Sequence, residues 1–135
     1  MKIYFAGSIR GGREDEEVYS EIIKLLLTHG EVLTEHIVGG KYDSTKQDLT
    51  ETEIYNRDVG MINSSDLVVA EVTTPSIGVG YEIAYAEAKE KKIICLYRNV
   101  EGKKKISAMI SGDKNLMVKE YQQVEELEPF FRENV

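Results

Sequence analysis

The first candidate for ligand binding is a glycine-rich loop at residues 7–13, which follows an apolar run. Its sequence is Gly-Ser-Ile-Arg-Gly-Gly-Arg. Its glycines allow close backbone approach, Ser8 offers a hydroxyl and Arg10 a forked cation, beside the N–H groups at the start of a helix. The dinucleotide fingerprint and the P-loop pattern are both missing. The loop is therefore interpreted either as a site for one phosphate group or as a turn with surface arginines.

Asp58 is the second candidate, because it lies within the apolar stripe of a predicted helix that also carries Ile54, Met61 and Ile62. Burying a carboxylate costs free energy unless the group is paired or hydrogen-bonded. Two interpretations stay open at this point. Asp58 is either held by a nearby arginine or a neighbouring loop, or it is aimed at a ligand.

Glu82 is the third candidate, and it follows the glycine-rich turn at residues 73–80. We expect it near the first turn of an alanine-rich helix, where the helix dipole helps to keep a carboxylate ionised. An attacking nucleophile needs that ionised form. The alternative is an ordinary first-turn glutamate that stabilises the end of the helix.

Together, two carboxylates and a phosphate loop at one end of a sheet allow cleavage of a glycosidic bond. One carboxylate attacks the anomeric carbon, and the other serves proton transfer or sugar positioning. The pattern permits this chemistry without singling it out.

The elements that must position these residues alternate between short β-rich runs and helical patterns, which predicts a parallel α/β sandwich of about five strands. Strands are expected at residues 2–6, 31–35, 67–72, 93–97 and 115–119, and helices at 14–29, 50–64, 80–91 and 124–132. Residues 38–47 are predicted to be a loop, 102–105 a basic surface turn, and 106–110 a short apolar segment. Ligands of such sheets bind at the carboxyl ends of the strands.

Composition narrows the class of protein. The 135 residues suit a single domain over residues 1–135, and a net charge of −7 argues against binding nucleic acid polymers. The single cysteine, Cys95, lies in an apolar run and is predicted to be buried in a strand. No apolar run reaches the length of a membrane helix and no signal peptide is seen, so a cytoplasmic location is expected, or equally a nuclear one in a eukaryote. The spacing of His29 and His36 fits no zinc motif, so no metal is expected.

The chain resembles the 2′-deoxynucleoside 5′-phosphate N-hydrolase (Rcl-type) family of the nucleoside deoxyribosyltransferase superfamily. The resemblance is carried by ordered segments through most of the chain, and as a set they are highly specific. They are residues 4–13 (YFAGSIRGGR), 32–36 (VLTEH), Asp58, 68–73 (VVAEVT), 75–82 (PSIGVGYE) and 107–110 (SAMI).

This resemblance implies a flavodoxin-like fold, a homodimer and no cofactor. It implies that Glu82 attacks C1′ of a nucleoside 5′-monophosphate to form a covalent glycosyl-enzyme, with Asp58 near the sugar and base. It further implies substrate contacts from Tyr4 near the sugar, from His36 near the base, and from Ser8, Ile9, Arg10, Gly11 and Ser76 on the phosphate side. Ser107 would reach the phosphate in the site of the neighbouring subunit, and Gly7, Gly78 and Met109 are further substrate-binding positions.

Two other functions stay open beside the hydrolase. One is a deoxyribosyltransferase that passes the sugar to a second base, although transferases of the superfamily use unphosphorylated nucleosides. The other is a non-catalytic module that binds nucleotides. The segment between His36 and Asp58 differs from the family pattern, and this leaves the base preference open, as the 2′-hydroxyl preference also is.

Overall fold

The computed structural model describes residues 1–9, 12–34, 49–102 and 105–135. Its strands form a parallel sheet in the order β2-β1-β3-β4-β5. The strands are β1 Lys2–Gly7, β2 Glu31–Val32, β3 Leu67–Glu71, β4 Lys92–Arg98 and β5 Met117–Tyr121. The predicted five-stranded, flavodoxin-like sandwich is thereby confirmed. The strand order reverses between β1 and β3, and ligands of such sheets bind outside the carboxyl ends of that pair.

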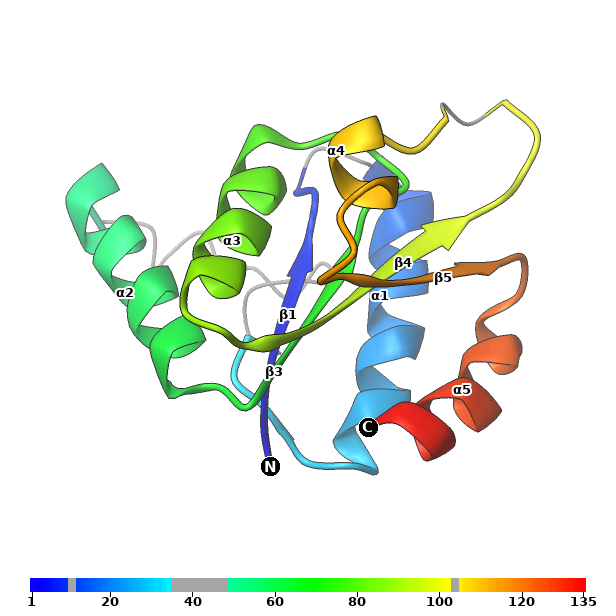
Figure 1. The fold of residues 1–135 in the computed structure, drawn as a ribbon, viewed down its shortest axis with the longest axis horizontal. Coiled ribbons are helices and arrows are strands. Elements are labelled where there is room, and N and C mark those ends of the chain that lie inside the picture. Colours follow the sequence, from blue (N-terminus) through cyan, green and yellow to red (C-terminus); the bar gives the residue numbers. More distant parts are fainter. Residues whose placement is uncertain (10–11, 35–48, 103–104) are drawn as a thin grey trace.

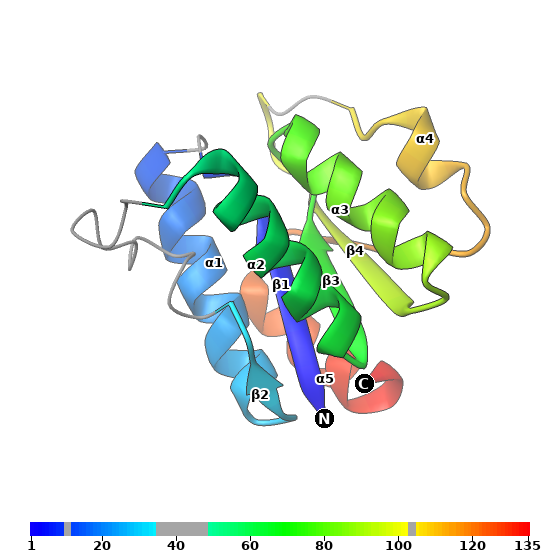
Figure 2. The same cartoon turned by 90° about the vertical axis from the view of Figure 1, so that its left-hand side faces the viewer.

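Helices cover both faces of the sheet, as Figure 1 shows. They are α1 Gly12–Leu27, α2 Glu51–Ser64, α3 Ile77–Ala88, the short α4 Ala108–Ser111, the 3₁₀ turn η2 Val124–Glu126 and α5 Leu127–Asn134. Helices α2 and α3 pack on one face and α1 and α5 on the other (Figure 2). None of the helices in the described part of the chain is long and apolar enough to cross a lipid bilayer.

The core divides into two clusters because successive side chains of a strand point to opposite faces. Ile3 and Phe5 of β1 pack against α1 and α5, whereas Tyr4 and Ala6 pack against α2 and α3. Strand β3 is buried over its whole length, as expected for a central parallel strand. Cys95 is buried in β4, as predicted, and burial raises the pKa of its thiol to about 12.

Several predicted boundaries are corrected. The strand expected at 31–35 ends at Val32, because the Thr34 side chain takes over the bonds to β1. Its hydroxyl accepts from the Phe5 N–H at 3.0 Å and donates to the Phe5 carbonyl at 2.8 Å. The last strand is Met117–Tyr121 rather than 115–119, and the closing helix is preceded by the separate turn η2. The loop expected at 38–47 lies outside the described residues.

The start of α2 is as predicted. Thr50 is the N-cap, and its hydroxyl accepts from the Glu53 N–H at 3.1 Å while the Glu53 carboxylate accepts from the Thr50 N–H at 3.0 Å. This reciprocal capping box satisfies two of the free donors at the helix end. Helix α2 thus begins at a fixed point, one turn before Ile54 and two turns before Asp58.

Candidate active site

A cavity of about 610 Å³ lies at the carboxyl end of the sheet, between β1, α2 and the start of α3. The residues of the sequence prediction that line it are Tyr4, Gly7, Ser8, Ile9, Asp58, Ser76, Gly78 and Glu82. The predicted positions Arg10, Gly11 and His36 lie outside the described residues. The fold therefore brings both carboxylates and the first part of the glycine loop around one volume, which is large enough for a small-molecule ligand.

Glu82 and Tyr4 meet at the wall of this cavity, where the phenolic hydroxyl of Tyr4 donates a hydrogen bond to Glu82 Oε2. Burial raises the pKa of Glu82 from 4.5 to about 7. The bond from Tyr4 acts in the opposite direction, whereas the charge of Asp58 raises this pKa further. Burial and the neighbouring Glu82 also raise the pKa of Tyr4, so the phenol stays a hydrogen-bond donor at neutral pH.

Asp58 lies on α2, and its side chain is 25% exposed rather than deeply buried. Arg57 Nε donates to Asp58 Oδ1 at 3.0 Å. The interpretations of pairing and ligand binding are therefore not exclusive, because Asp58 is paired with an arginine and lines the cavity. Arg57 itself escaped the sequence prediction. Its charge lowers the pKa of Glu82, although less than burial raises it.

The turn that carries Glu82 differs from the prediction. Helix α3 begins at Ile77 and not at residue 80, because the Ser76 hydroxyl accepts from the Val79 N–H at 3.2 Å and caps the helix. Glu82 therefore lies in the second turn, where the effect of the helix dipole has largely faded. The expectation that the dipole keeps Glu82 ionised is wrong. Desolvation is the largest contribution, and it raises the pKa of Glu82 to about 7.

The glycine loop packs closely against α1. A Cβ at Gly7 would lie 2.7 Å from the Tyr19 ring, so this position has no room for a side chain. The Tyr19 hydroxyl accepts a hydrogen bond from the Ser8 N–H at 3.1 Å. Ser8 is thus held at the cavity wall from behind, while Ile9 is 72% exposed.

Two tyrosines at the cavity were missed by the sequence prediction. Tyr55 of α2 and Tyr81 of α3 stand edge to face with ring centroids 6.2 Å apart, and both line the cavity. Their side chains remain largely exposed, at 47% and 56%. Tyr55 precedes Asp58 by about one helical turn and Tyr81 precedes Glu82 directly. That spacing was the only signal in the sequence that pointed to them.

Ser107 and Met109 do not line this cavity. They border a second hollow of about 550 Å³ between α3 and α4, which shares Pro75, Ser76 and Ile77 with the first. Ser107 is the exposed N-cap of α4, and its hydroxyl accepts from the Met109 N–H at 3.2 Å. Within one chain, these two residues are therefore separated from the cavity by the start of α3.

A buried polar cluster on the opposite face of the same sheet end was not predicted. Glu71, the last residue of β3, accepts from the N–H and hydroxyl of Thr73 at 2.7 and 3.0 Å and from the Tyr121 hydroxyl. Burial raises the pKa of Glu71, and these bonds counteract the rise. Arg98 ends β4 and pairs with Asp15 at 3.1 Å, with side chains only 7% and 2% exposed. A glutamate interrupting the apolar run 67–72 was the signal available in the sequence.

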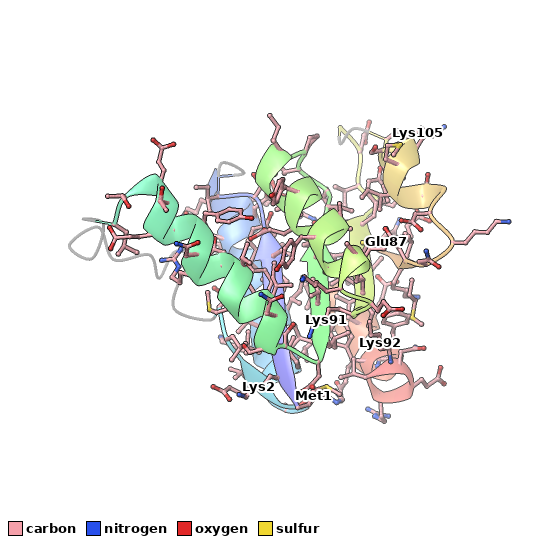
Figure 3. All side chains as sticks on the ribbon, turned by 60° about the vertical axis from the view of Figure 1, so that its left-hand side comes forward. Met1, Lys2, Glu87, Lys91, Lys92 and Lys105 are labelled. Atoms are coloured by element: carbon pink, nitrogen blue, oxygen red, sulfur yellow. The ribbon has the colours of Figure 1, made fainter. Side chains whose placement is uncertain are left out.

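Other polar residues lie elsewhere. Lys2, Lys91 and Lys92 lie at the amino end of the strands, far from the cavity, whereas Lys105 lies near α4 (Figure 3). Lys91 Nζ donates to the carbonyls of Asn63 and Ser65 at 2.8 and 2.9 Å, a structural role at the end of α2. Across residues 1–9, 12–34, 49–102 and 105–135, no three His, Cys, Asp or Glu side chains gather as a metal site would require.

Comparison with known proteins adds to this geometry. The family model described as nucleoside 2-deoxyribosyltransferase matches residues 3–127. A putative 2′-deoxynucleoside 5′-phosphate N-hydrolase 1 of Nematostella vectensis is 51% identical over 129 residues, covering 90% of this chain and 86% of that protein. A 5-hydroxymethyl-dUMP N-hydrolase of Tetraodon nigroviridis is 45% identical and covers 97% of each chain. The CMP N-glycosidase of Clostridium botulinum has the same fold, with a TM-score of 0.69, 19% identity and complete coverage of both chains.

Proposed function

The chain belongs to the nucleoside 2-deoxyribosyltransferase family, and from that premise we propose that it hydrolyses the N-glycosidic bond of nucleoside 5′-monophosphates, with Glu82 as nucleophile. The products are the free base and ribose or deoxyribose 5-phosphate. The relatives named as N-hydrolases of nucleotides support this reaction class. The observation that carries the proposal is the meeting of Glu82, Tyr4 and Asp58 in one cavity that Ser8 and Ser76 also line.

The proposed reaction runs in two steps. The ionised Glu82 carboxylate attacks C1′, and the C1′–N bond breaks with its electron pair leaving on the base, which takes up a proton. Water then attacks C1′, the glycosyl ester bond breaks, and the sugar 5-phosphate leaves with Glu82 restored as a carboxylate. Tyr4 stabilises the charge of Glu82 before attack, because its hydroxyl donates to that oxygen. Asp58 positions the sugar or serves proton transfer.

The phosphate is assigned to the side of the cavity formed by Gly7, Ser8, Ile9 and Ser76, together with Arg10 and Gly11 from the sequence motif. Ser8 offers a hydroxyl, and the glycine backbone permits close approach. This assignment favours a monophosphate over an unphosphorylated nucleoside. Arg10→Ala is expected to weaken nucleotide binding by about 1.5–3 kcal/mol, the range for a hydrogen bond to a charged group.

The proposed enzyme is a homodimer in which Ser107 of each chain reaches the phosphate in the site of the other. The second hollow supports this arrangement, because Ile77 and Met109 border it with side chains 95% and 81% exposed. Apolar side chains exposed around a hollow are typical of a surface that binds a partner. The hollow also adjoins Ser76 at the phosphate side of the cavity.

A mixing experiment tests the shared site. Glu82→Ala and Ser107→Ala homodimers should each be impaired. After exchange of subunits, each heterodimer contains one site with both residues intact. Random exchange makes half of the dimers mixed, so activity should recover to about a quarter of the wild-type value. No recovery from two folded, exchanging variants would place Ser107 outside the partner's site.

Product analysis by chromatography tests the reaction itself. The protein is incubated with deoxynucleoside monophosphates, nucleoside monophosphates and unphosphorylated nucleosides, and released base is measured. Base from a monophosphate, with little from the matching nucleoside, supports the proposal and reveals the base and sugar preference. Absence of base from every compound at protein concentrations near that of the substrate, despite tight binding, would favour a non-catalytic nucleotide-binding module.

Transfer of the sugar to another base is the second candidate, because the matching family model is described as a deoxyribosyltransferase. Adding a second free base to the same incubation separates the two reactions. A hydrolase releases sugar 5-phosphate whether or not the second base is present. A transferase instead yields a new nucleoside or nucleotide that carries the added base.

A further inference from the structure

The buried cluster behind the cavity contains a chain of polar contacts that joins two separate loops. Arg98 Nη1 and Nη2 donate to Glu14 Oε1 at 2.7 Å and to Asp15 Oδ1 at 3.1 Å, both at the start of α1. The other oxygen of Asp15 accepts from the Thr74 hydroxyl at 2.5 Å. Asp15 therefore connects the beginning of α1, next to the glycine loop, with the turn between β3 and α3.

A second contact fixes the same turn from the other side. The backbone N–H of Arg98 donates to the Thr73 hydroxyl at 2.8 Å, and Thr73 in turn donates to Glu71. Arg98 thus holds Thr73 through its backbone and Thr74 through Asp15. Ser76, the cap of α3 and a cavity residue, follows Thr74 by only two positions.

Burying the charged groups of this network costs free energy. Buried ion pairs lose hydration that their mutual attraction often fails to recover, and apolar side chains of similar size are frequently as stable or more so. The Nε of Arg98 is moreover buried without a partner among the described residues. Its geometry is nevertheless directional, since a guanidinium fork and a carboxylate fix both distance and orientation.

We propose that Arg98 is a positioning residue, which acts through Asp15 and Thr74 to set the separation between the two loops that carry Ser8 and Ser76 to the cavity wall. The Tyr19 hydroxyl of α1 holds the backbone of Ser8, and the bond from Thr74 to Asp15 holds the turn that leads to Ser76. The inference rests on the proposed function in one respect, namely that Ser8 and Ser76 face the phosphate. Arg98 itself does not line the cavity and touches no reacting atom.

The test compares Arg98→Met, Arg98→Lys and Thr74→Val with a control on the same face of the sheet. Arg132→Met is that control, because Arg132 is 69% exposed and its ion pair within the described residues is with Glu128, along α5 at 3.0 Å. For each protein one measures kcat and KM for a monophosphate, the Kd of inorganic phosphate by calorimetry, and the thermal midpoint. Calorimetry reports on phosphate binding without requiring turnover.

A group misplaced by about 1 Å can lower catalysis by about 100-fold. We expect a comparable sensitivity in ligand binding, so Arg98→Met should weaken phosphate binding by about 10- to 100-fold. Thr74→Val, which removes one tether and keeps the ion pair, should raise KM several-fold while kcat changes less than about twofold. Arg98→Lys should recover part of the binding, since it restores charge without the fork. Arg132→Met should match the wild type.

Unchanged phosphate affinity in folded Thr74→Val and Arg98→Lys proteins would overturn the positioning role, even if Arg98→Met fails to fold. Variants in which kcat and the thermal midpoint both fall while KM and the phosphate Kd stay unchanged would also overturn the positioning role and leave a purely structural one. If the wild type binds phosphate but hydrolyses no nucleotide, the proposed function fails separately, and the phosphate Kd values still decide the role of Arg98.

Discussion

The two faces of the sheet carry the same four kinds of side chain at the same end and use them differently. On the face of α2 and α3, a glutamate, an aspartate and a tyrosine line the open cavity, Glu82, Asp58 and Tyr4, and an arginine, Arg57, pairs with the aspartate. On the face of α1 and α5, the same types form the closed cluster: Glu71, Asp15, Tyr121 and Arg98. Residue type alone therefore does not distinguish the group proposed to react from the structural one.

The difference lies in access and in hydrogen bonding. Burial raises the pKa of Glu82 and of Glu71 alike. Glu71 nevertheless accepts bonds from Thr73 and Tyr121 and is only 1% exposed, whereas Glu82 accepts from Tyr4 and lines the cavity. A carboxylate that is desolvated and still accessible is suited to attack a substrate, and one enclosed by donors is suited to hold strands together.

Exchange of each glutamate for alanine gives the largest expected contrast. Glu82→Ala should lower turnover by about three orders of magnitude or more, because the variant lacks the carboxylate proposed to form the glycosyl bond. Its fold and oligomeric state should persist. Glu71→Ala should instead destabilise the protein, by leaving Thr73 and Tyr121 without their acceptor. Activity assays alongside thermal unfolding separate the two, and retained turnover in Glu82→Ala would remove Glu82 as the nucleophile.

Exchange of each aspartate should give the next largest contrast. Asp15→Ala removes the buried ion-pair partner of the Arg98 guanidinium and leaves its pair with the exposed Glu14, and it should lower the free energy of unfolding by about 3–5 kcal/mol. Asp58→Ala should change that free energy by less than about 1 kcal/mol, since the partly exposed pair with Arg57 contributes little, while it lowers activity. Denaturant titrations measure both. Equal destabilisation would show that the two faces do not differ in this respect.

The pH dependence of activity tests the raised pKa of Glu82 in the cavity. Because the pKa of Glu82 is raised from 4.5 to about 7, kcat/KM should increase as pH rises through about 7. The charge of Asp58 contributes to the raised pKa of Glu82, so Asp58→Asn should move the midpoint of the activity profile to lower pH. A profile of residual activity against pH decides the point, and a midpoint near 4.5 in the wild type would contradict the desolvated state.

The same shift links Glu82 to stability. The folded state favours the protonated form of Glu82. The contribution of this group to the free energy of unfolding is therefore fully present below about pH 4.5 and is lost as pH rises through about 7. Its size should be about 1–3 kcal/mol. Unfolding of Glu82→Gln should lack this part of the pH dependence and should leave that mutant more stable than the wild type at pH 8. The absence of any such difference would speak against burial of the charge.

The smallest contrast comes from the two tyrosines. Tyr121→Phe removes a donor from the enclosed Glu71 and should cost about 1–2 kcal/mol of unfolding free energy. Tyr4→Phe should cost less, because water entering the cavity replaces its hydroxyl. It should instead raise the pKa of Glu82 and move the activity midpoint to higher pH, since the Tyr4 bond lowers that pKa. A Tyr4→Phe profile identical to the wild type would show that the bond does not tune the nucleophile.

Much of the fold and of the cavity could be predicted from the sequence, because the signals were local. Alternating apolar runs predicted the five strands, and the helical pattern at residues 50–64 predicted α2. The glycines at 78 and 80 misled the prediction of α3, since their low helix propensity suggested a turn. The Ser76 cap outweighs that propensity and moves Glu82 away from the helix end.

The closed cluster could not be predicted because its partners are remote in sequence. Arg98 and Asp15 lie 83 positions apart, and Tyr121 and Glu71 lie 50 apart. A single arginine after a strand is ordinarily interpreted as a surface residue. Only the tertiary packing shows that this one is enclosed, and the same holds for the meeting of Tyr4 with Glu82 across 78 positions.

The pairing of β1 with β3 also has a consequence for how the chain is made. Ile3 lies opposite Leu67 in the parallel ladder, so the first apolar strand emerges from the ribosome long before its central partner. Parallel sheets with such distant pairings fold slowly and expose unpaired strand edges meanwhile. Residues 2–7 therefore stay without their β3 partner until residues 67–71 have been synthesised.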